Sequence, residues 1–156
     1  MTFIGIDPGL NGAIAFFDSI KGHLSVVDMP TVELLRNGKK KREVSAQILA
    51  TIIRCVGDKS LAVIERVNAM PGQGVTSVFS FGRSSGIVEG VLAALEIPTQ
   101  IVTPQMWQKA ASVRGGKDGA RQRATELFPA YAGLFARKKD DGRADASCMA
   151  WYAATH

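Results

Sequence analysis

The stretch Ile4-Gly5-Ile6-Asp7-Pro8-Gly9 decides the fold of this chain. The segment 2–7 is apolar and β-branched up to its final carboxylate, which is typical of a buried strand. A carboxylate at the end of a buried strand is unfavourable unless something pairs with it. The sequence therefore predicts a buried strand that ends in a carboxylate needing a partner.

Two further segments place carboxylates beside apolar runs: Ala62-Val63-Ile64-Glu65 and Asp141-Gly142-Arg143-Ala144-Asp145. On a helix, Asp141 and Asp145 would share one face, where like charges are mildly destabilising and a cation is favoured. Carboxylate oxygens are hard ligands that suit Mg²⁺ or Mn²⁺. Two such ions can cut a phosphodiester without a covalent nucleophile, so the pattern favours metal-dependent cutting of nucleic acid.

Each carboxylate also has a structural interpretation. Asp7 could belong only to a strand-ending turn, and Glu65 could pair with Arg66 at the surface. Asp141 could be the N-cap of its helix, although capping and metal binding are compatible. Asp140 is expected to point to another side of the helix and is left out of the metal set.

Length and composition predict one folded domain spanning residues 1–156, with 46% hydrophobic residues. The longest apolar stretches, such as Gly90–Leu95, are too short to cross a bilayer, and we expect no signal peptide. Cys55 and Cys148 are expected to be reduced core residues. These features favour a cytoplasmic protein.

The net charge of +5 is concentrated in three basic groups. Clustered cations attract phosphate backbones through counterion release. One such group is compatible with an ordinary solvated surface, but three groups flanking acidic positions favour a nucleic-acid partner. The groups are Arg36, Lys39, Lys40, Lys41 and Arg42; Lys109, Arg114, Lys117, Arg121 and Arg123; and Arg137, Lys138, Lys139 and Arg143.

Hydrophobic periodicity predicts an α/β fold, a mixed five-stranded sheet flanked by helices on both faces. Strands are expected at 2–7, 12–17, 24–27, 61–64 and 98–103. Helices are expected at 44–56, about 76–95, 119–128 and 142–154, with 30–42 as a polar connection. The first and fourth strands should be adjacent and parallel, which would make Asp7 and Glu65 neighbours.

Taken together, these motifs resemble the RuvC-type Holliday junction resolvases of the ribonuclease-H-like nuclease superfamily. The resemblance runs nearly end to end, and the order and spacing of its parts make it specific. The parts are residues 4–9, 62–65, 70–74 through Phe81-Gly82, Val102-Thr103-Pro104 with Trp107, and 141–146. The Pro-Gly after Glu65 and the Asp-Gly-Arg-Ala-Asp motif are more similar to phage and prophage members than to the bacterial housekeeping enzyme.

The resemblance implies a homodimeric endonuclease that cuts four-way DNA junctions symmetrically, in the cytoplasm of a bacterial or phage-infected cell. It implies that Asp7, Glu65, Asp141 and Asp145 bind two Mg²⁺ ions per site. Mn²⁺ is expected to substitute for Mg²⁺. It further implies a dimer interface on the helix after Glu65, where Gly82, Gly86 and Gly90 would permit close helix approach. Packing of that helix on its own sheet is the alternative use of these glycines.

The loop after Glu65 is expected to reach the junction crossover. Its candidate contacts are Asn68, Met70 and Gln73, with Phe79 beyond. The other expected DNA contacts are Arg36, Lys39, Lys40, Lys41, Arg42, Lys109, Arg114, Arg121 and Arg143. Lys117 is expected to be the catalytic cation at the scissile phosphate, with Lys109 and Arg143 as alternatives. The run 36–42 is not a feature of the family core and is interpreted as an added DNA arm.

The chain departs from the family at its last acidic pair. The bacterial enzyme spaces these aspartates three residues apart, whereas here Gly142 occupies that position and Asp141 lies four residues before Asp145. Asp141 is therefore the expected ligand, with Asp140 as a residue that could share the role. Rival functions are cutting of flaps, forks or RNA–DNA hybrids, a non-catalytic DNA-binding module, and a fragment of an actin-like ATPase.

Overall fold

The computed structural model describes residues 1–57, 59–69 and 71–156. Its main sheet contains five strands in the order β3-β2-β1-β6-β7. Their bounds are β1 Thr2–Ile6, β2 Ala13–Asp18, β3 His23–Asp28, β6 Ser60–Glu65 and β7 Thr99–Val102. The strands β1, β2 and β3 form an antiparallel meander, while β6 is parallel to both β1 and β7. The predicted mixed sheet is confirmed.

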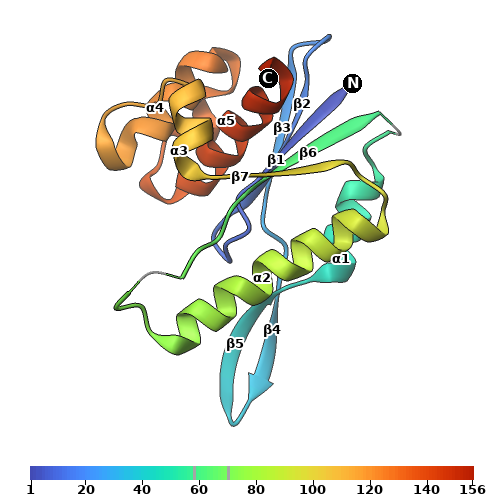
Figure 1. The fold of residues 1–156 in the computed structure, drawn as a ribbon, viewed down its shortest axis with the longest axis vertical. Coiled ribbons are helices and arrows are strands. Elements are labelled where there is room, and N and C mark those ends of the chain that lie inside the picture. The colour runs from blue at the N-terminus through green and yellow to red at the C-terminus, as the bar shows by residue number, and fades with distance from the viewer. Residues whose placement is uncertain (58, 70) are drawn as a thin grey trace.

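Helices cover both faces of this sheet, as predicted (Figure 1). On one face lie α1 and α2, and on the other lie α3, α4 and α5 (Figure 1). Their bounds are α1 Ala46–Arg54, α2 Val75–Ala94, α3 Pro104–Ala110, α4 Gly119–Leu127 and α5 Asp141–Thr155. Short 3₁₀ turns, η1 Gly116–Asp118, η2 Pro129–Phe135 and η3 Lys138–Asp140, connect the later helices.

The sheet separates two hydrophobic cores. Alternate residues of a strand face opposite sides of a sheet, so Ile4 and Ile6 pack toward α1 and α2, where they meet Leu49 and Leu92. The opposite core contains the fully buried Trp107 together with residues of η2 and α5. The central strand β1 is therefore covered on both faces, which explains its nearly continuous apolar run.

Direct contact between α5 and β1 depends on Gly5. A Cβ added at Gly5 would lie 2.0 Å from the carbonyl oxygen of Ala146 and 2.4 Å from the amide nitrogen of Ala150. Only a residue without a side chain allows the backbone of α5 to come this close to the strand. This contact fixes the distance between the first turns of α5 and the end of β1.

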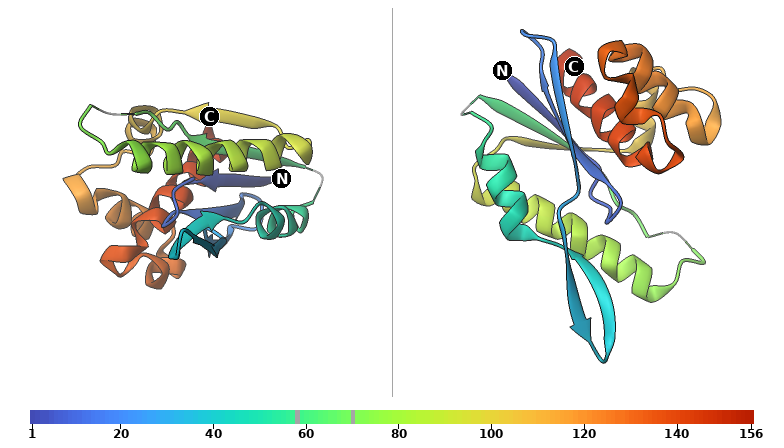
Figure 2. Two further views of the ribbon diagram at one scale, coloured as in Figure 1. Left: turned by 90° about the horizontal axis from the view of Figure 1, so that it is seen from below. Right: turned by 180° about the vertical axis from the view of Figure 1, so that it is seen from behind.

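The predicted polar connection at 30–42 was wrong. These residues form a second, two-stranded sheet made of β4 Thr31–Arg36 and β5 Lys39–Val44, which projects beyond the main sheet (Figure 2). Asn37 and Gly38 form the turn with φ values of 51° and 71°. An Asn-Gly pair with positive φ at both positions is a strong hairpin signal, and the density of positive charge around it obscured that signal.

Other local expectations also needed correction. The helix expected from residue 44 begins at Ala46, because the Ser45 side chain accepts a hydrogen bond from the Ile48 amide and caps it. The sequence did not predict α3, which Thr103 caps. Cys148 is buried as expected, whereas Cys55 is exposed. No helix in the described part of the chain is long and apolar enough to span a membrane.

Candidate active site

Asp7 and Glu65 lie at the neighbouring ends of two parallel strands. Ile6 of β1 is paired with Ile64 of β6. The residues that follow them, Asp7 and Glu65, therefore lie at the same end of the two strands. The side-by-side arrangement predicted from the sequence is confirmed. Burial raises the pKa of Glu65, and the charge of the neighbouring Asp7 adds to this shift.

The first turns of α5 bring Asp145 to the same place. Asp7, Asp141 and Asp145 line a hollow of about 590 Å³, whose opposite wall is the N-terminal half of α2. Gly142 makes this approach possible, since a Cβ there would lie 2.7 Å from the carbonyl oxygen of Asn11 and 3.1 Å from Asp7 Oδ2. The helix start is thus packed against the loop that follows β1.

The pKa values of three of these carboxyl groups are raised above their ordinary values. Burial, together with the charges of Asp7, Glu65 and Asp141, raises the pKa of Asp145 to about 8. Burial also raises the pKa of Asp7, against a hydrogen bond of 3.1 Å from the Gly9 amide to Oδ1. Burial raises the pKa of Glu65 as well. Within the described residues, no cation lies within ion-pair distance of these three side chains.

Asp141 has a different environment. Its side chain is 51% exposed, and Arg121 Nε lies 2.8 Å from its Oδ1. Arg121 also pairs with Asp118, so one guanidinium holds carboxylates from η1 and α5. The charge of Asp141 is therefore already compensated in part, and Arg121 is not a free cation for DNA in this conformation.

The donor set can be tested for its fit to a divalent metal. Among residues 1–57, 59–69 and 71–156, no three Asp, Glu, His or Cys side chains are arranged as ligands of one ion. The chemistry of the set does fit, because it consists of carboxylate oxygens whose negative charges are crowded, partly buried and uncompensated. A divalent cation would favour the charged forms of these carboxylates and so oppose the effect of burial on their pKa values. Metal binding stays a prediction.

Asp140 is a structural residue of this site. It is 2% exposed, and its carboxylate accepts hydrogen bonds from Arg137 Nη2 at 2.9 Å and Nε at 3.1 Å. These bonds hold the pKa of Asp140 below its usual range. Arg143 lies 3.7 Å from the same carboxylate and binds Asp28 through two nitrogens, at 2.6 and 2.8 Å. These contacts secure the start of α5 and leave Asp140 no open ligand position.

The predicted DNA contacts fall into two groups. Arg121 and Arg143 are held in ion pairs, and Arg42 donates to the Leu10 carbonyl oxygen and to Asn11 Oδ1. These arginines fix the loops around the site. The second group is exposed and consists of Arg36, Lys39, Lys40, Lys41, Asn68, Gln73, Phe79, Lys109 and Arg114, of which Arg36 and Lys40 also pair with Glu43 and Glu33. Met70 and the side chain of Lys117 lie outside the described residues, so the structure does not place them.

The glycines of α2 lie on its solvent-facing side. Gly82, Gly86 and Gly90 are exposed, and a Cβ added at any of them would meet nothing within 4 Å. The alternative in which this stripe packs on its own sheet is therefore wrong. Their role in a dimer stays a prediction.

Sequence reasoning missed the role of Trp107. It is fully buried in α3, and its Nε1 donates a hydrogen bond of 2.9 Å to Glu65 Oε1. This bond fixes one oxygen of the carboxylate. A buried tryptophan usually finds a partner for its N–H, which was the one available signal, but the sequence could not say which partner.

The fold and the carboxylate positions define the class: this is the ribonuclease-H-like fold. Two solved structures with a similar fold are "T. thermophilus RuvC in complex with Holliday junction substrate" and "Thermus thermophilus RuvC structure". The first matches with a TM-score of 0.63 and 14% identity, over 99% of this chain and 95% of that chain. The second matches with a TM-score of 0.57 and 15% identity, over 99% and 96%. The resemblance in fold to RuvC is thereby confirmed.

No protein-family model and no curated protein sequence matches the chain.

Removing the indole N–H of Trp107 tests its part in orienting Glu65. Trp107→Phe keeps most of the aromatic volume but leaves Glu65 Oε1 without its donor. We expect Mn²⁺ to bind about 10–100-fold more weakly, measured by calorimetry, as is typical when a partner of a metal ligand is lost. The matched control is Trp151→Phe, the other tryptophan. Equal metal affinity of the two variants would exclude the positioning role.

The variant Asp145→Asn tests whether the pKa of this carboxyl group is raised in the folded protein. The folded-state pKa of about 8 lies above the ordinary value of 3.8, so the metal-free protein loses stability as pH rises through this interval. Without metal, we expect the variant to match the wild type near pH 4 and to be more stable at pH 8 by roughly 1–3 kcal/mol, after allowance for solvent screening. Urea unfolding in EDTA measures this difference.

The control for this experiment is Glu33→Gln on the exposed hairpin, which should show no growing difference with pH. Adding Mg²⁺ should stabilise the wild type more than Asp145→Asn, by mass action on the folded state. A difference in the free energy of unfolding that does not grow between pH 5 and pH 8 would argue against a raised pKa of Asp145.

Proposed function

We propose that this protein is a metal-dependent endonuclease that resolves four-way DNA junctions by paired, symmetric nicks. The observation that carries the proposal is the convergence of Asp7, Glu65 and Asp145 at one end of a RuvC-like fold. The solved RuvC complex with a Holliday junction substrate supports the choice of substrate. The proposed setting is the cytoplasm of a bacterial or phage-infected cell, where branched DNA arises.

In this proposal Asp7, Glu65, Asp145 and Asp141 hold Mg²⁺ or Mn²⁺, as two ions per site. Such ions activate a water and stabilise the leaving oxygen of a phosphodiester. The chain supplies the orientation of its ligands: Trp107 fixes Glu65, and the Gly9 amide fixes Asp7. Packing of α5 against the loop after β1 excludes water from one side of the carboxylates.

The cation at the scissile phosphate is proposed to be Lys117, with Lys109 as the alternative. Arg143 is the weakest of the earlier candidates, because both of its donor edges are directed at Asp28 and Asp140. A guanidinium already bound to two carboxylates would have to leave them before it could bind a phosphate.

Paired nicks require two active sites, which we propose a homodimer supplies. The exposed side of α2 is the proposed interface, since Gly82, Gly86 and Gly90 leave it open to a close neighbour. Small residues let two helix backbones approach closely. Glycine in a helix interior lowers helix propensity, so three glycines on one face of α2 need a compensating role such as close helix packing.

Glu65→Gln tests the catalytic assignment. Loss of this carboxylate should abolish cutting of a labelled immobile four-way junction in Mg²⁺, while binding of the junction in EDTA is preserved. The measurement combines single-turnover cleavage with a binding titration. A linear duplex, a flap and an RNA–DNA hybrid serve as comparison substrates for the wild type.

Symmetric nicks in the junction alone are the expected result. Cutting of the flap or hybrid instead would keep the metal site but reject the junction as the substrate. No cutting of any substrate in Mg²⁺ or Mn²⁺ would leave a DNA-binding module. Cutting by Glu65→Gln would reject the metal-site assignment.

Gly86→Leu tests the dimer interface. The monomer should fold normally, because the added side chain points into open space, but the close helix approach is blocked. We expect a change from dimer to monomer in sedimentation velocity, and single rather than paired nicks. The control is Gly57→Leu, at another exposed position with no neighbour within 4 Å. A Gly86→Leu variant that stays dimeric would place the interface elsewhere.

A further inference from the structure

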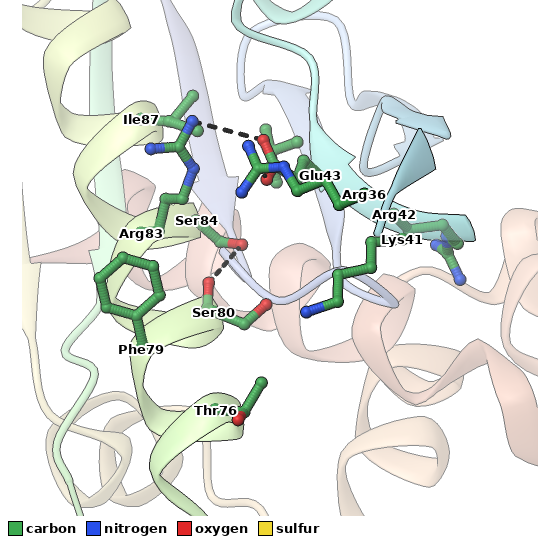
Figure 3. Close-up of a pocket in the computed structure, with 11 residues that line it drawn as sticks. Arg36, Lys41, Arg42, Glu43, Thr76, Phe79, Ser80, Arg83, Ser84 and Ile87 are labelled. Carbon is green, nitrogen blue, oxygen red and sulfur yellow. Dashed lines mark hydrogen bonds and ion pairs between the residues drawn. The ribbon is translucent and has the colours of Figure 1, made fainter. Parts of the chain in front are cut away.

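A second hollow lies beside the catalytic one, between β5 and the N-terminal half of α2 (Figure 3). We call it the hairpin–α2 groove. Its volume is about 250 Å³, and four cationic side chains and one carboxylate line it. The cations are Arg36, Lys41 and Arg42 from the hairpin and Arg83 from α2. The groove therefore has an excess of positive charge, which favours an anionic occupant.

The charged residues of the groove differ in their availability. Glu43 pairs with Arg36 at 2.8 Å and with Arg83 at 3.3 Å, so both guanidinium groups are held at the groove wall (Figure 3). Arg42 instead binds the loop after β1. Lys41 has no ion-pair partner among the described residues. The groove thus combines two arginines of fixed orientation with one free lysine.

An exposed aromatic ring lies among these cations. Phe79 is 68% exposed, one helical turn before Arg83. A phenyl ring left in water beside phosphate-binding cations is typical of surfaces on which single-stranded nucleic acid stacks its bases. Only a base whose face is uncovered can stack in this way, so a fully stacked duplex does not fit the ring.

The groove is continuous with the catalytic hollow. The hydroxyl residues Thr76, Ser80 and Ser84 line both cavities, and the second of these cavities contains Asp7 and Asp145. Figure 3 shows Ser80 and Ser84 on the side of α2 that faces the hairpin. Hydroxyl groups are common phosphate contacts in DNA complexes. A strand lying in the groove would therefore pass over α2 to reach the carboxylates.

We propose that the hairpin–α2 groove binds the unpaired DNA strand next to the phosphodiester that is cut. Phe79 stacks on a base of this strand, and Lys41 and Arg83 contact its phosphates. A second copy of the chain would be a poor occupant of the groove, because it would bring an equally basic hairpin to a basic surface. The catalytic end of this path rests on the function proposed above, but strand binding is measurable without cutting.

The test measures binding in EDTA by fluorescence anisotropy, with three labelled probes of equal length: oligothymidylate, an abasic strand and a duplex. Phe79→Ala should weaken binding of oligothymidylate about tenfold or more, through loss of stacking, and leave the abasic strand and duplex unaffected. Lys41→Ala should weaken both single strands and reduce the salt slope by about 0.7, the value for one phosphate contact on a single strand.

Two controls match these changes in kind. Ile20→Ala and Lys21→Ala remove an exposed apolar side chain and an exposed cation in the β2–β3 turn, at a site outside the groove. The proposal would be overturned if the groove variants bound oligothymidylate as tightly as the two control variants. This holds even if the wild type cuts junctions. Equal weakening of duplex and single strand by Phe79→Ala would overturn it as well.

The two proposals can fail separately. A wild type that cuts no branched DNA, combined with groove variants that lose strand binding, would reject the resolvase and support the groove.

Discussion

The close contact between α5 and the loop after β1 is the constraint on which the rest of the site depends. At Gly5 an added Cβ would lie 2.0 Å from the backbone of α5, and at Gly142 it would lie 2.7 Å from the Asn11 carbonyl oxygen. Larger residues would push the helix away and carry Asp145 with it. Because position 142 has no room for a side chain, no carboxylate can lie three residues before Asp145, and Asp141 is the additional carboxylate that lines the hollow.

The arginines near the site stabilise the elements around it and do not pair with Asp145. Arg143 binds Asp28, and Arg121 holds Asp141, so two ion pairs secure the first turns of α5 from different sides. Neither arginine pairs with Asp145, whose pKa is raised by burial and by the charges of Asp7, Glu65 and Asp141. An arginine placed there would stabilise the metal-free protein, but it would also occupy the position of the cation that we propose to bind there.

Features that the sequence predicted well are local ones. An apolar run that ends in a carboxylate indicates a buried strand and the point where it ends, and both β1 and β6 carry this motif. The contacts of the site are not local. Trp107 and Glu65 are 42 positions apart, and no periodicity connects them. The hairpin was missed for another reason: the charge of 36–42 was interpreted as function, while the Asn37-Gly38 turn was overlooked.

The hairpin and the active site are connected through Arg42. This side chain belongs to β5 but binds the Leu10 carbonyl oxygen and Asn11 Oδ1, on the loop that also holds Asp7. The position of the hairpin is therefore coupled to that of Asp7, and a strand bound in the hairpin–α2 groove as we propose would meet the site along a fixed path. The proposed selectivity would then have a physical source, because a stacked duplex offers no open base to Phe79, whereas a strand at a branch point does.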